Sequence, residues 1–205
     1  MNRKNRNELP EVIALILMVV VLAGCGSPPS TRFYALSSLA TGDTRSVGDI
    51  VQARTIVGIG PIALAKYLEY PAITVRSGAN TLVRSEMNRW GGSLGDEVSR
   101  VLVENVGHLL SAEQYLVVPW LEPVGNDLRL QLIINRFEAT SAQEVVFNGV
   151  WLLFAGDDNN PLASGDVALV EPLETGDYPA ITAAMSRILA ELSRLVVEHI
   201  RAAPR

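Results

Sequence analysis

The 205-residue chain has very few of the side chains from which metal and redox centres are built. It contains one cysteine, Cys25, and two well-separated histidines, His108 and His199. A zinc site needs several such ligands at short spacing, and an internal disulfide needs a second cysteine. We therefore expect no internal disulfide, no metal and no cofactor.

Basic residues are also few. The chain has 17 basic and 22 acidic residues, of which three basic and two acidic ones lie in positions 1–24. The remainder therefore has 14 basic and 20 acidic residues and a net charge of −6. Lys66 is the only lysine in this remainder, and its arginines are scattered. Nucleic-acid-binding domains are usually basic, with lysine and arginine clustered. The sequence thus predicts no nucleic-acid partner.

Long apolar runs are absent except near the start of the chain. Arg3, Lys4 and Arg6 precede an apolar run of 11 residues at positions 12–22. A bilayer-spanning helix needs about 20 apolar residues. A basic segment followed by a short apolar run is typical of an export signal, so residues 1–24 are predicted to be a signal peptide.

The single cysteine follows this run directly. Residues 22–25 read Leu-Ala-Gly-Cys and resemble the lipobox of bacterial lipoproteins, which implies cleavage before Cys25 and diacylglycerol on its sulfur. The alternative is a small core cysteine, but a lone thiol suits an oxidising compartment poorly. Two or three acyl chains form a lasting anchor. Gly26 stands where an aspartate would signal inner-membrane retention, so this resemblance favours the outer membrane and its periplasmic face.

The rest of the chain is predicted to form one domain behind a short tether. Residues 25–31 are the lipidated tether, in which Pro28 and Pro29 favour extended backbone. Residues 32–202 are the domain, and 203–205 are a tail. No repeat or low-complexity tract interrupts the domain.

Hydrophobic periodicity indicates two long amphipathic helices and a set of strands. The first helix is expected at about 94–111, and the second ends the chain, with Pro179 in its first turn. Strands are expected at 32–36, 55–59, 72–75, 81–84, 115–118, 128–135, 144–154 and 164–170, the second stopped by Gly60-Pro61 and the last two joined as a hairpin. We predict an α/β or α+β fold, a single domain with a mixed β-sheet and the two helices packed on it.

One short stretch resembles a catalytic motif. Residues 91–95 read Gly-Gly-Ser-Leu-Gly and match the G-x-S-x-G nucleophile elbow of serine hydrolases. Ser93, Asp157 or Asp166, and His199 also follow the chain order of a hydrolase triad. However, residues 87–90 are largely polar where a buried strand is needed, and His199 falls within a predicted helix.

A helix cap explains the same serine more simply. Ser93 precedes the apolar helical periodicity, and Asp96 stands three residues later, which is the capping-box pattern. Glu97 adds a second acid where the helix dipole favours one. We therefore expect Ser93 to cap a helix, and an envelope serine hydrolase is kept as the alternative.

Several short segments together resemble a known family. They are Phe-Tyr-Ala-Leu at 33–36, Val-Gly-Ile-Gly-Pro-Ile at 57–62, Tyr-Leu-Glu-Tyr-Pro at 67–71 and Asn-Arg-Trp at 88–90. In this order behind a lipobox, and with an apolar C-terminal helix, they resemble the ABC-transport auxiliary lipoproteins of the PqiC/YmbA type. The resemblance implies an outer-membrane lipoprotein of an envelope transport system that moves phospholipid or related lipids.

The resemblance also implies a role and partners. The chain would be a docking or adaptor subunit, not an enzyme, that supports membrane integrity. Its partners would be an MCE-domain protein that bridges the periplasm and the inner-membrane transporter components, with self-association into a homo-oligomer left open. Arg89, Trp90 and residues 60–71 are then expected to face the partner, or else Trp90 fills the core. A stand-alone lipid-binding lipoprotein is a further alternative and would need a large apolar pocket.

Overall fold

The computed structural model describes residues 30–39, 55–120, 125–156 and 158–204, which form a single α+β domain. In this part of the chain an eight-stranded mixed sheet carries two long helices. The predicted signal peptide, Cys25 and the tether up to residue 29 lie outside the described residues. No helix in the described ranges is long and apolar enough to cross a bilayer.

Strands and helices are interspersed along the chain. The domain begins with β1 (Arg32–Tyr34), β2 (Thr55–Leu64), the 3-10 turn η1 (Lys66–Leu68), β3 (Ala72–Gly78) and β4 (Thr81–Trp90). It continues with α2 (Leu94–Leu109), β5 (Tyr115–Pro119), β6 (Leu128–Thr140), β7 (Glu144–Ala155), β8 (Pro161–Pro172) and α3 (Tyr178–Ala202). This order confirms the expected mixture of strands and two long helices.

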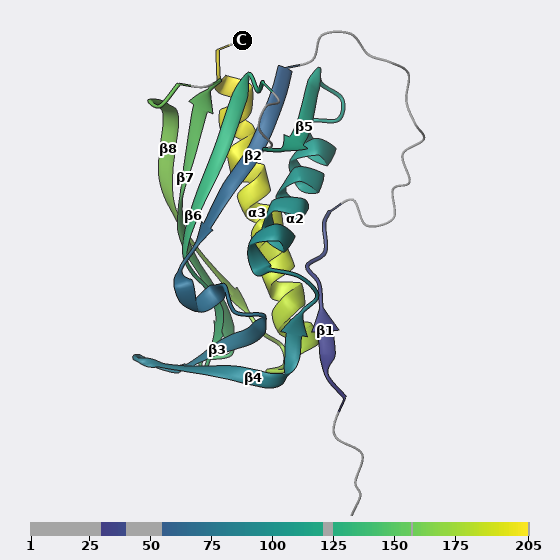
Figure 1. Cartoon of the computed structure of the whole chain (residues 1–205), viewed down its shortest axis with the longest axis vertical. Helices are drawn as coiled ribbons and strands as arrows, with labels where there is room; N and C mark the ends of the chain where they lie inside the picture. The colour runs from purple at the N-terminus through teal and green to yellow at the C-terminus, as the bar shows by residue number, and fades with distance from the viewer. Residues whose placement is uncertain (1–29, 40–54, 121–124, 157, 205) are drawn as a thin grey trace, which may run out of the picture. The chain divides into compact units, whose positions relative to one another are not determined.

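The sheet forks at β6, its central strand. Along one edge β6 pairs antiparallel with β7, which pairs antiparallel with β8. Along the other edge, the first half of β6 pairs parallel with β2, and its last residues, Ala139 and Thr140, pair parallel with β3. One branch therefore continues from β2 to β5, and the other from β3 through β4 to β1 (Figure 1).

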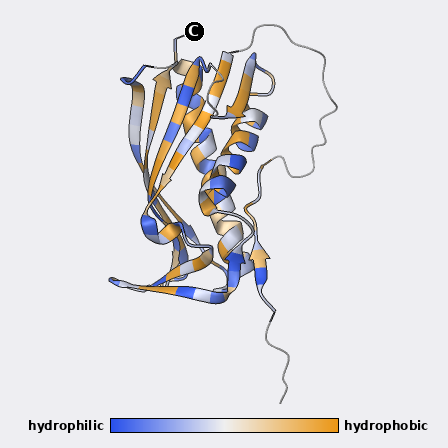
Figure 2. Ribbon diagram, viewed as in Figure 1, coloured by the Kyte–Doolittle hydropathy of each residue, from blue (hydrophilic) through white to orange (hydrophobic). Residues whose placement is uncertain are grey.

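The two helices lie side by side on one face of the sheet and run in the same direction (Figure 1). At their C-terminal ends, Arg201 of α3 donates to the carbonyl of Leu109, the last residue of α2, at 3.3 Å. In Figure 2, hydrophobic and hydrophilic residues alternate along these elements, as expected where one face is buried.

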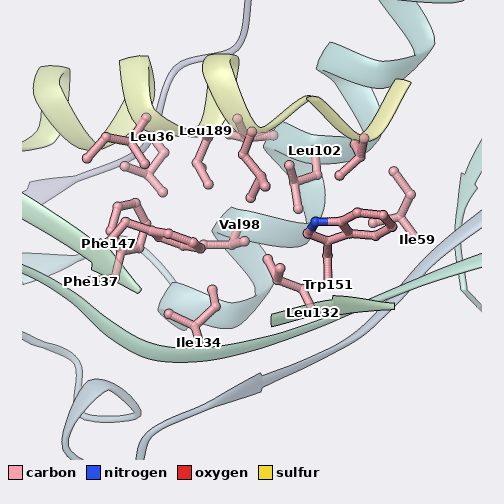
Figure 3. Close-up of a cluster of buried hydrophobic side chains, with 14 of the residues drawn as sticks. Leu36, Ile59, Val98, Leu102, Leu132, Ile134, Phe137, Phe147, Trp151 and Leu189 are labelled. Carbon is pink, nitrogen blue, oxygen red and sulfur yellow. The ribbon is translucent and has the colours of Figure 1, made fainter. Parts of the chain in front are cut away.

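The core lies between the helices and the sheet (Figure 3). Phe137 of β6 and Phe147 of β7 meet edge to face, with ring centroids 5.2 Å apart. Trp151 is also buried, and Val98 of α2 and Leu189 of α3 close the core from the helix side. Burial of such side chains contributes about 1.5–3 kcal/mol each, so this layer holds the two helices on the sheet.

The expectation that Gly60-Pro61 stops the second strand is wrong. β2 continues to Leu64 through a register shift between Ile59 and Ile62, with a cis Gly60–Pro61 peptide bond and φ of +131° at Gly60. Glycine adopts positive φ at little cost, and a bulge tolerates a proline that lacks an N–H. A bulge, not a strand end, therefore accounts for the pair.

Several other strands also extend beyond their expected bounds. β6 continues to Thr140, and β8 runs from Pro161 to Pro172 because proline is tolerated at strand ends and on an edge strand. β4 includes the polar residues 87–90, which we did not expect to form a strand. β4 has a bulge just before its C-terminal end. Within the bulge, the backbone N–H and the side chain of Asn88 both donate to the Ser85 hydroxyl, at 3.0 and 2.8 Å.

Candidate functional site

Ser93 caps α2, as the sequence predicts. Its backbone is extended, with φ of −75° and ψ of 145°, and its Oγ accepts a hydrogen bond from the backbone N–H of Asp96 at 3.1 Å. Asp96 and Glu97 stand in the first helical turn, where the helix dipole favours negative charge. Ser93 thus has a complete structural role at the start of the helix.

The structure does not assemble the hydrolase triad. His199 lies in the last turn of α3, where its ring stacks on Trp151 at 4.5 Å between centroids. Because the helices run in parallel, His199 sits near the C-terminal end of α2, about 24 Å along that helix from Ser93. Asp166 is exposed on β8, and Asp157 lies outside the described residues. A strand does precede Ser93, contrary to our expectation, but it ends at Trp90.

Ser93 lies instead on the wall of a cleft of about 360 Å³. The bulge of β2 forms one wall and the first turns of α2 form the other, while Trp120, which follows β5, closes one end. The cleft is lined by Ile59, Gly60, Pro61, Ile62, Leu64, Glu69, Ser93, Gly95, Asp96, Ser99 and Trp120. It joins two segments singled out in the sequence, 60–71 and 91–95.

The lining of the cleft mixes acidic, polar and apolar side chains. Glu69 and Asp96 contribute carboxylates, and Ser99 contributes a hydroxyl, whereas Leu64 and the ring of Trp120 are apolar. A stand-alone lipid carrier needs a concave and mostly apolar pocket for its cargo. This mixed lining suits a polypeptide or another polar partner better than acyl chains.

Residues 36–39, which we name the strap, fasten the chain that follows β1 to both helices. The backbone N–H groups of Leu36 and Leu39 donate to Glu97 at 2.9 Å and to the Oδ1 of Asn105 at 2.7 Å, both on α2. The N–H of Ser37 donates to the Ser186 hydroxyl of α3 at 3.0 Å. The strap thus couples the start of the domain directly to its helical layer.

A buried apolar side chain and an ion pair reinforce the strap. Leu36 is only 2% exposed and belongs to the core. Arg100 donates to the carbonyl of Leu36 at 2.6 Å and to Glu97 at 2.8 Å. The hydrogen bond from Arg100 to Glu97 raises the pKa of the guanidinium, which stays charged and holds both groups.

A buried carboxylate stands where the sheet forks. The side chain of Glu138 is fully buried, and its Oε1 accepts from Arg76 at 2.7 Å and from Arg136 at 2.9 Å. Its Oε2 accepts from the Tyr67 hydroxyl at 2.6 Å and from the backbone N–H of Phe137 at 3.0 Å. This cluster therefore ties β3 and the η1 turn to the end of β6.

The cluster shifts the pKa values of its members. Burial raises the pKa of Glu138, but the hydrogen bonds from Tyr67, Arg76 and Arg136 outweigh it and hold the pKa below the usual carboxyl value. Burial and the bond to Glu138 raise the pKa of Tyr67 to about 12. The hydrogen bond to Glu138 also raises the pKa of Arg76. A carboxylate with four donors is well satisfied, which favours a structural role at the fork.

The two residues expected to face a partner have different environments. Trp90 is 4% exposed and belongs to the hydrophobic core, so the alternative interpretation, in which it fills the core, is correct. Strand alternation explains this, because Trp90 and its neighbour Tyr34 point inward while Arg89 points outward. Arg89 alone is exposed and available for contact.

Sequence reasoning missed the strap and the Glu138 cluster. The strap is irregular chain without periodicity, so no local pattern marks it. Glu138 stands between the apolar residues Phe137 and Ala139 near the end of β6, and this charged residue within a strand is the one signal that could have identified it. The described residues contain no group of three or more histidine, cysteine, aspartate or glutamate side chains arranged to hold a metal ion.

Comparisons with known proteins identify the family and the fold. The model of the family described as ABC-type transport auxiliary lipoprotein component matches residues 34–197. A search of curated proteins finds no significant match. The crystal structure of an uncharacterized protein is similar with a TM-score of 0.69 and 18% identity, covering 84% of this chain and 99% of that one.

Protein XCC0632 from Xanthomonas campestris is also similar. Its crystal structure matches with a TM-score of 0.62 and 17% identity, covering 81% of this chain and 92% of that chain. At such low identity these two structures establish the fold alone. The family match spans β2 to β8 and most of α3, which includes the cleft and the Glu138 cluster.

Proposed function

Because the chain belongs to the family of ABC-type transport auxiliary lipoproteins, we propose that it is the docking subunit of an envelope lipid transporter, anchored by lipid on Cys25 to the periplasmic face of the outer membrane. In this role it holds the outer-membrane end of a conduit formed by an MCE-domain protein, which connects to inner-membrane components. The family is one of transport auxiliaries, not one defined by an enzymatic activity.

The fastening of the strap to both helices is the observation that supports this role. The strap comes 11 residues after Cys25, and its three backbone hydrogen bonds reach α2 and α3. A docking subunit has to hold its partner at a fixed place relative to its anchor. A body that is hydrogen-bonded close to the tether, and not joined through a long linker, meets that need.

We assign partner binding to the cleft beside Ser93. The cleft is large enough for a few side chains of a docked segment, and Trp120 provides an aromatic anchor of the kind that contributes most to protein interfaces. Asp96 places a carboxylate in its lining, whereas Glu69 is already paired with Lys66, so the cleft favours a partner segment that brings a basic residue to Asp96. Lipid transport then needs no catalytic group in this chain.

The test is capture of the transporter by the lipidated full-length protein. In envelope extracts of the native host, the wild-type protein should retain an MCE-domain protein, and Trp120→Ala and Asp96→Asn should each reduce its recovery several-fold. Glu191→Gln, on the exposed face of α3, is the matched control and should retain the partner. Equal recovery with all four proteins would reject the cleft, and no MCE-domain protein with any of them would reject the docking role.

The anchor is tested separately. Radiolabelled palmitate should be incorporated into the wild-type protein and be absent from Cys25→Ser, which should leave the membrane fraction. Membrane fractionation should place the wild-type protein with outer-membrane markers. Recovery in the inner-membrane fraction would contradict the predicted location while leaving the family membership unaffected.

A further inference from the structure

An exposed aromatic and cationic surface lies on the branch of the sheet nearest the tether. Phe33 is 68% exposed on β1 and stands beside Arg89 of β4, which in turn stands beside Ala72 of β3. Arg84, which is also exposed, pairs with Thr74 across the bulge of β4. The backbone N–H of Trp90 donates to the carbonyl of Pro71 at 2.8 Å, so the segment that precedes β3 lies beside this end of β4.

Tyr70 belongs to the same surface. Its ring is 49% exposed, and the guanidinium of Arg84 lies 3.6 Å from the ring centroid. We call Phe33, Tyr70, Arg84 and Arg89 the tether-proximal face. Within the described ranges neither of its arginines has a carboxylate within salt-bridge distance, a property that they share with Arg32, Arg129 and Arg194, whereas the other five described arginines each form an ion pair.

This charge pattern is unusual for the chain as a whole, which carries a formal net charge of −5. Two acidic residues are close to it along the chain: Glu86, in the bulge of β4, and Glu69, which pairs with Lys66 at 3.0 Å. The face therefore keeps a local positive charge on an acidic protein. Such a surface is complementary to an anion, and the guanidinium fork matches phosphate in particular.

The tether limits how far this face can be from the anchor. Eight residues separate Cys25 from Phe33, and fully extended chain spans at most about 28 Å over that length. The two prolines of the tether favour extension but do not lengthen it. Residues just beyond the C-terminal end of α2 lie about 24 Å from its first turn, measured along the helix axis. If lipid is attached at Cys25, the tether holds Phe33 within its own length of the bilayer.

We propose that the tether-proximal face lies in the headgroup layer of the bilayer that holds the anchor. Phe33 enters the interface between headgroups and acyl chains, and Tyr70 lies at headgroup level, where amphipathic rings are enriched in membrane proteins. Arg84 and Arg89 bind phospholipid phosphates, with their aliphatic stems along the apolar surface. The inference rests on the proposed lipid anchor, and it assigns Arg89 to the bilayer in place of a protein partner.

The face orients the domain, a property that a flexible anchor alone does not provide. Two attachments, the acyl chains and the tether-proximal face, restrict rotation about the tether. The cleft, whose lining includes Glu69 next to Tyr70, then keeps a fixed height and direction above the bilayer. This contact deepens the docking role, because a transporter that spans the periplasm has to find its receptor in a constant orientation.

The test uses the fact that lipidation consumes the only native thiol. Ala35 and Ala112 are both exposed, the first beside Phe33 and the second just beyond the C-terminal end of α2. Ala35→Cys and Ala112→Cys each place one free thiol in the lipidated protein for a fluorescent label. The proteins are reconstituted in vesicles of phosphatidylethanolamine and phosphatidylglycerol that contain a headgroup-level nitroxide lipid as quencher. We expect several-fold stronger quenching at position 35 than at position 112.

Further variants test which side chains make the contact. In the Ala35→Cys protein, adding Phe33→Ser or the pair Arg84→Gln and Arg89→Gln should lower the quenching toward the level at position 112. Arg194→Gln, an exposed arginine on α3, should leave it unchanged. Unchanged quenching in the Phe33 and arginine variants would overturn the assignment of the contact to these side chains.

Failure of the face and failure of the anchor give different results. A protein that floats with the vesicles but is quenched equally at both positions would overturn the face alone. A protein that keeps a reactive Cys25 thiol and does not float would overturn the anchor and the inference that rests on it. Protection of the label at position 35 only after addition of an MCE-domain protein would show that the face binds protein and would also overturn the proposal.

Discussion

Arg76 and Glu138 join one branch of the sheet to its central strand: the Nε of Arg76 on β3 lies 2.7 Å from the Oε1 of Glu138 near the end of β6. The Glu138 side chain is fully buried, and that of Arg76 is 22% exposed. The backbone pairing between these strands is short, Val75 with Ala139 and Arg76 with Thr140. The side-chain contact therefore supplements a weak backbone junction.

Glu138→Gln should destabilise the domain by about 2 kcal/mol, because hydrogen bonds to a charged group are each worth about 1.5–3 kcal/mol and the two arginines lose their counter-charge. Both arginines can turn partly to water, which keeps the loss moderate. Urea unfolding followed by circular dichroism measures the change. Glu191→Gln, on the exposed face of α3, should stay within about 0.5 kcal/mol; equal losses in the two variants would contradict a special role for Glu138.

Tyr67 should make the domain sensitive to alkali. Its pKa is raised from 10.0 to about 12 by burial and by the bond to Glu138, so the folded state holds this proton more tightly than the unfolded state does. The resulting stability is complete below pH 10 and is lost as the pH rises toward 12. Tyr67→Phe has no proton to lose there, so its free energy of unfolding should decline less steeply over that range. The same slope in both proteins would exclude Tyr67 as the source.

Ser93→Ala should cost about 1 kcal/mol, the usual value for an N-cap. The reason is that the Ser93 hydroxyl satisfies the backbone N–H of Asp96. Ser93→Asp retains an acceptor and should restore most of the stability. Thermal unfolding of the wild type, Ser93→Ala and Ser93→Asp measures the stability of each protein. Wild-type stability in Ser93→Ala would show that the cap contributes little.

Leu36→Ala should loosen the strap and cost about 2–5 kcal/mol, the range for removing a buried leucine side chain. Leu36 is 2% exposed, and its backbone N–H and carbonyl are both bonded to α2 side chains. Limited proteolysis should cut near residues 36–39 several-fold faster in the variant. Leu162→Ala, at a side chain that is 43% exposed, is the control and should change neither stability nor cleavage.

The periodic parts of the fold could be predicted from the sequence, and those parts that depend on distant segments could not. The apolar spacing of α2 and the serine before it located that helix and its cap. Taken alone, Gly60-Pro61 predicts the end of a strand. In the structure β2 pairs with β6 on both sides of these two residues, so they form a bulge within one continuous strand. The burial of Trp90 follows from pairing with β1 and could not be read from its polar neighbours.

In the candidate site, too, single residues could be predicted from local sequence, but their arrangement depends on distant segments. Ser93 and residues 60–71 were recognised separately, but their meeting in one cleft depends on the packing of α2 against β2. Arg89 was identified from the resemblance, whereas its neighbours Phe33 and Arg84 come from other parts of the β1–β4–β3 branch. Local sequence thus identified individual residues, and the sheet register showed which of them lie on neighbouring strands.

The strap has a mechanical consequence. β1 runs parallel to β4, and the strap follows it across α2 and α3. A pulling force applied at residue 30 along the strand therefore loads these hydrogen bonds together in shear, and does not open them one after another as in a zipper. Several bonds sharing one load resist detachment better than the same bonds broken in turn, so tension on the tether would reach both helices before the domain begins to unravel.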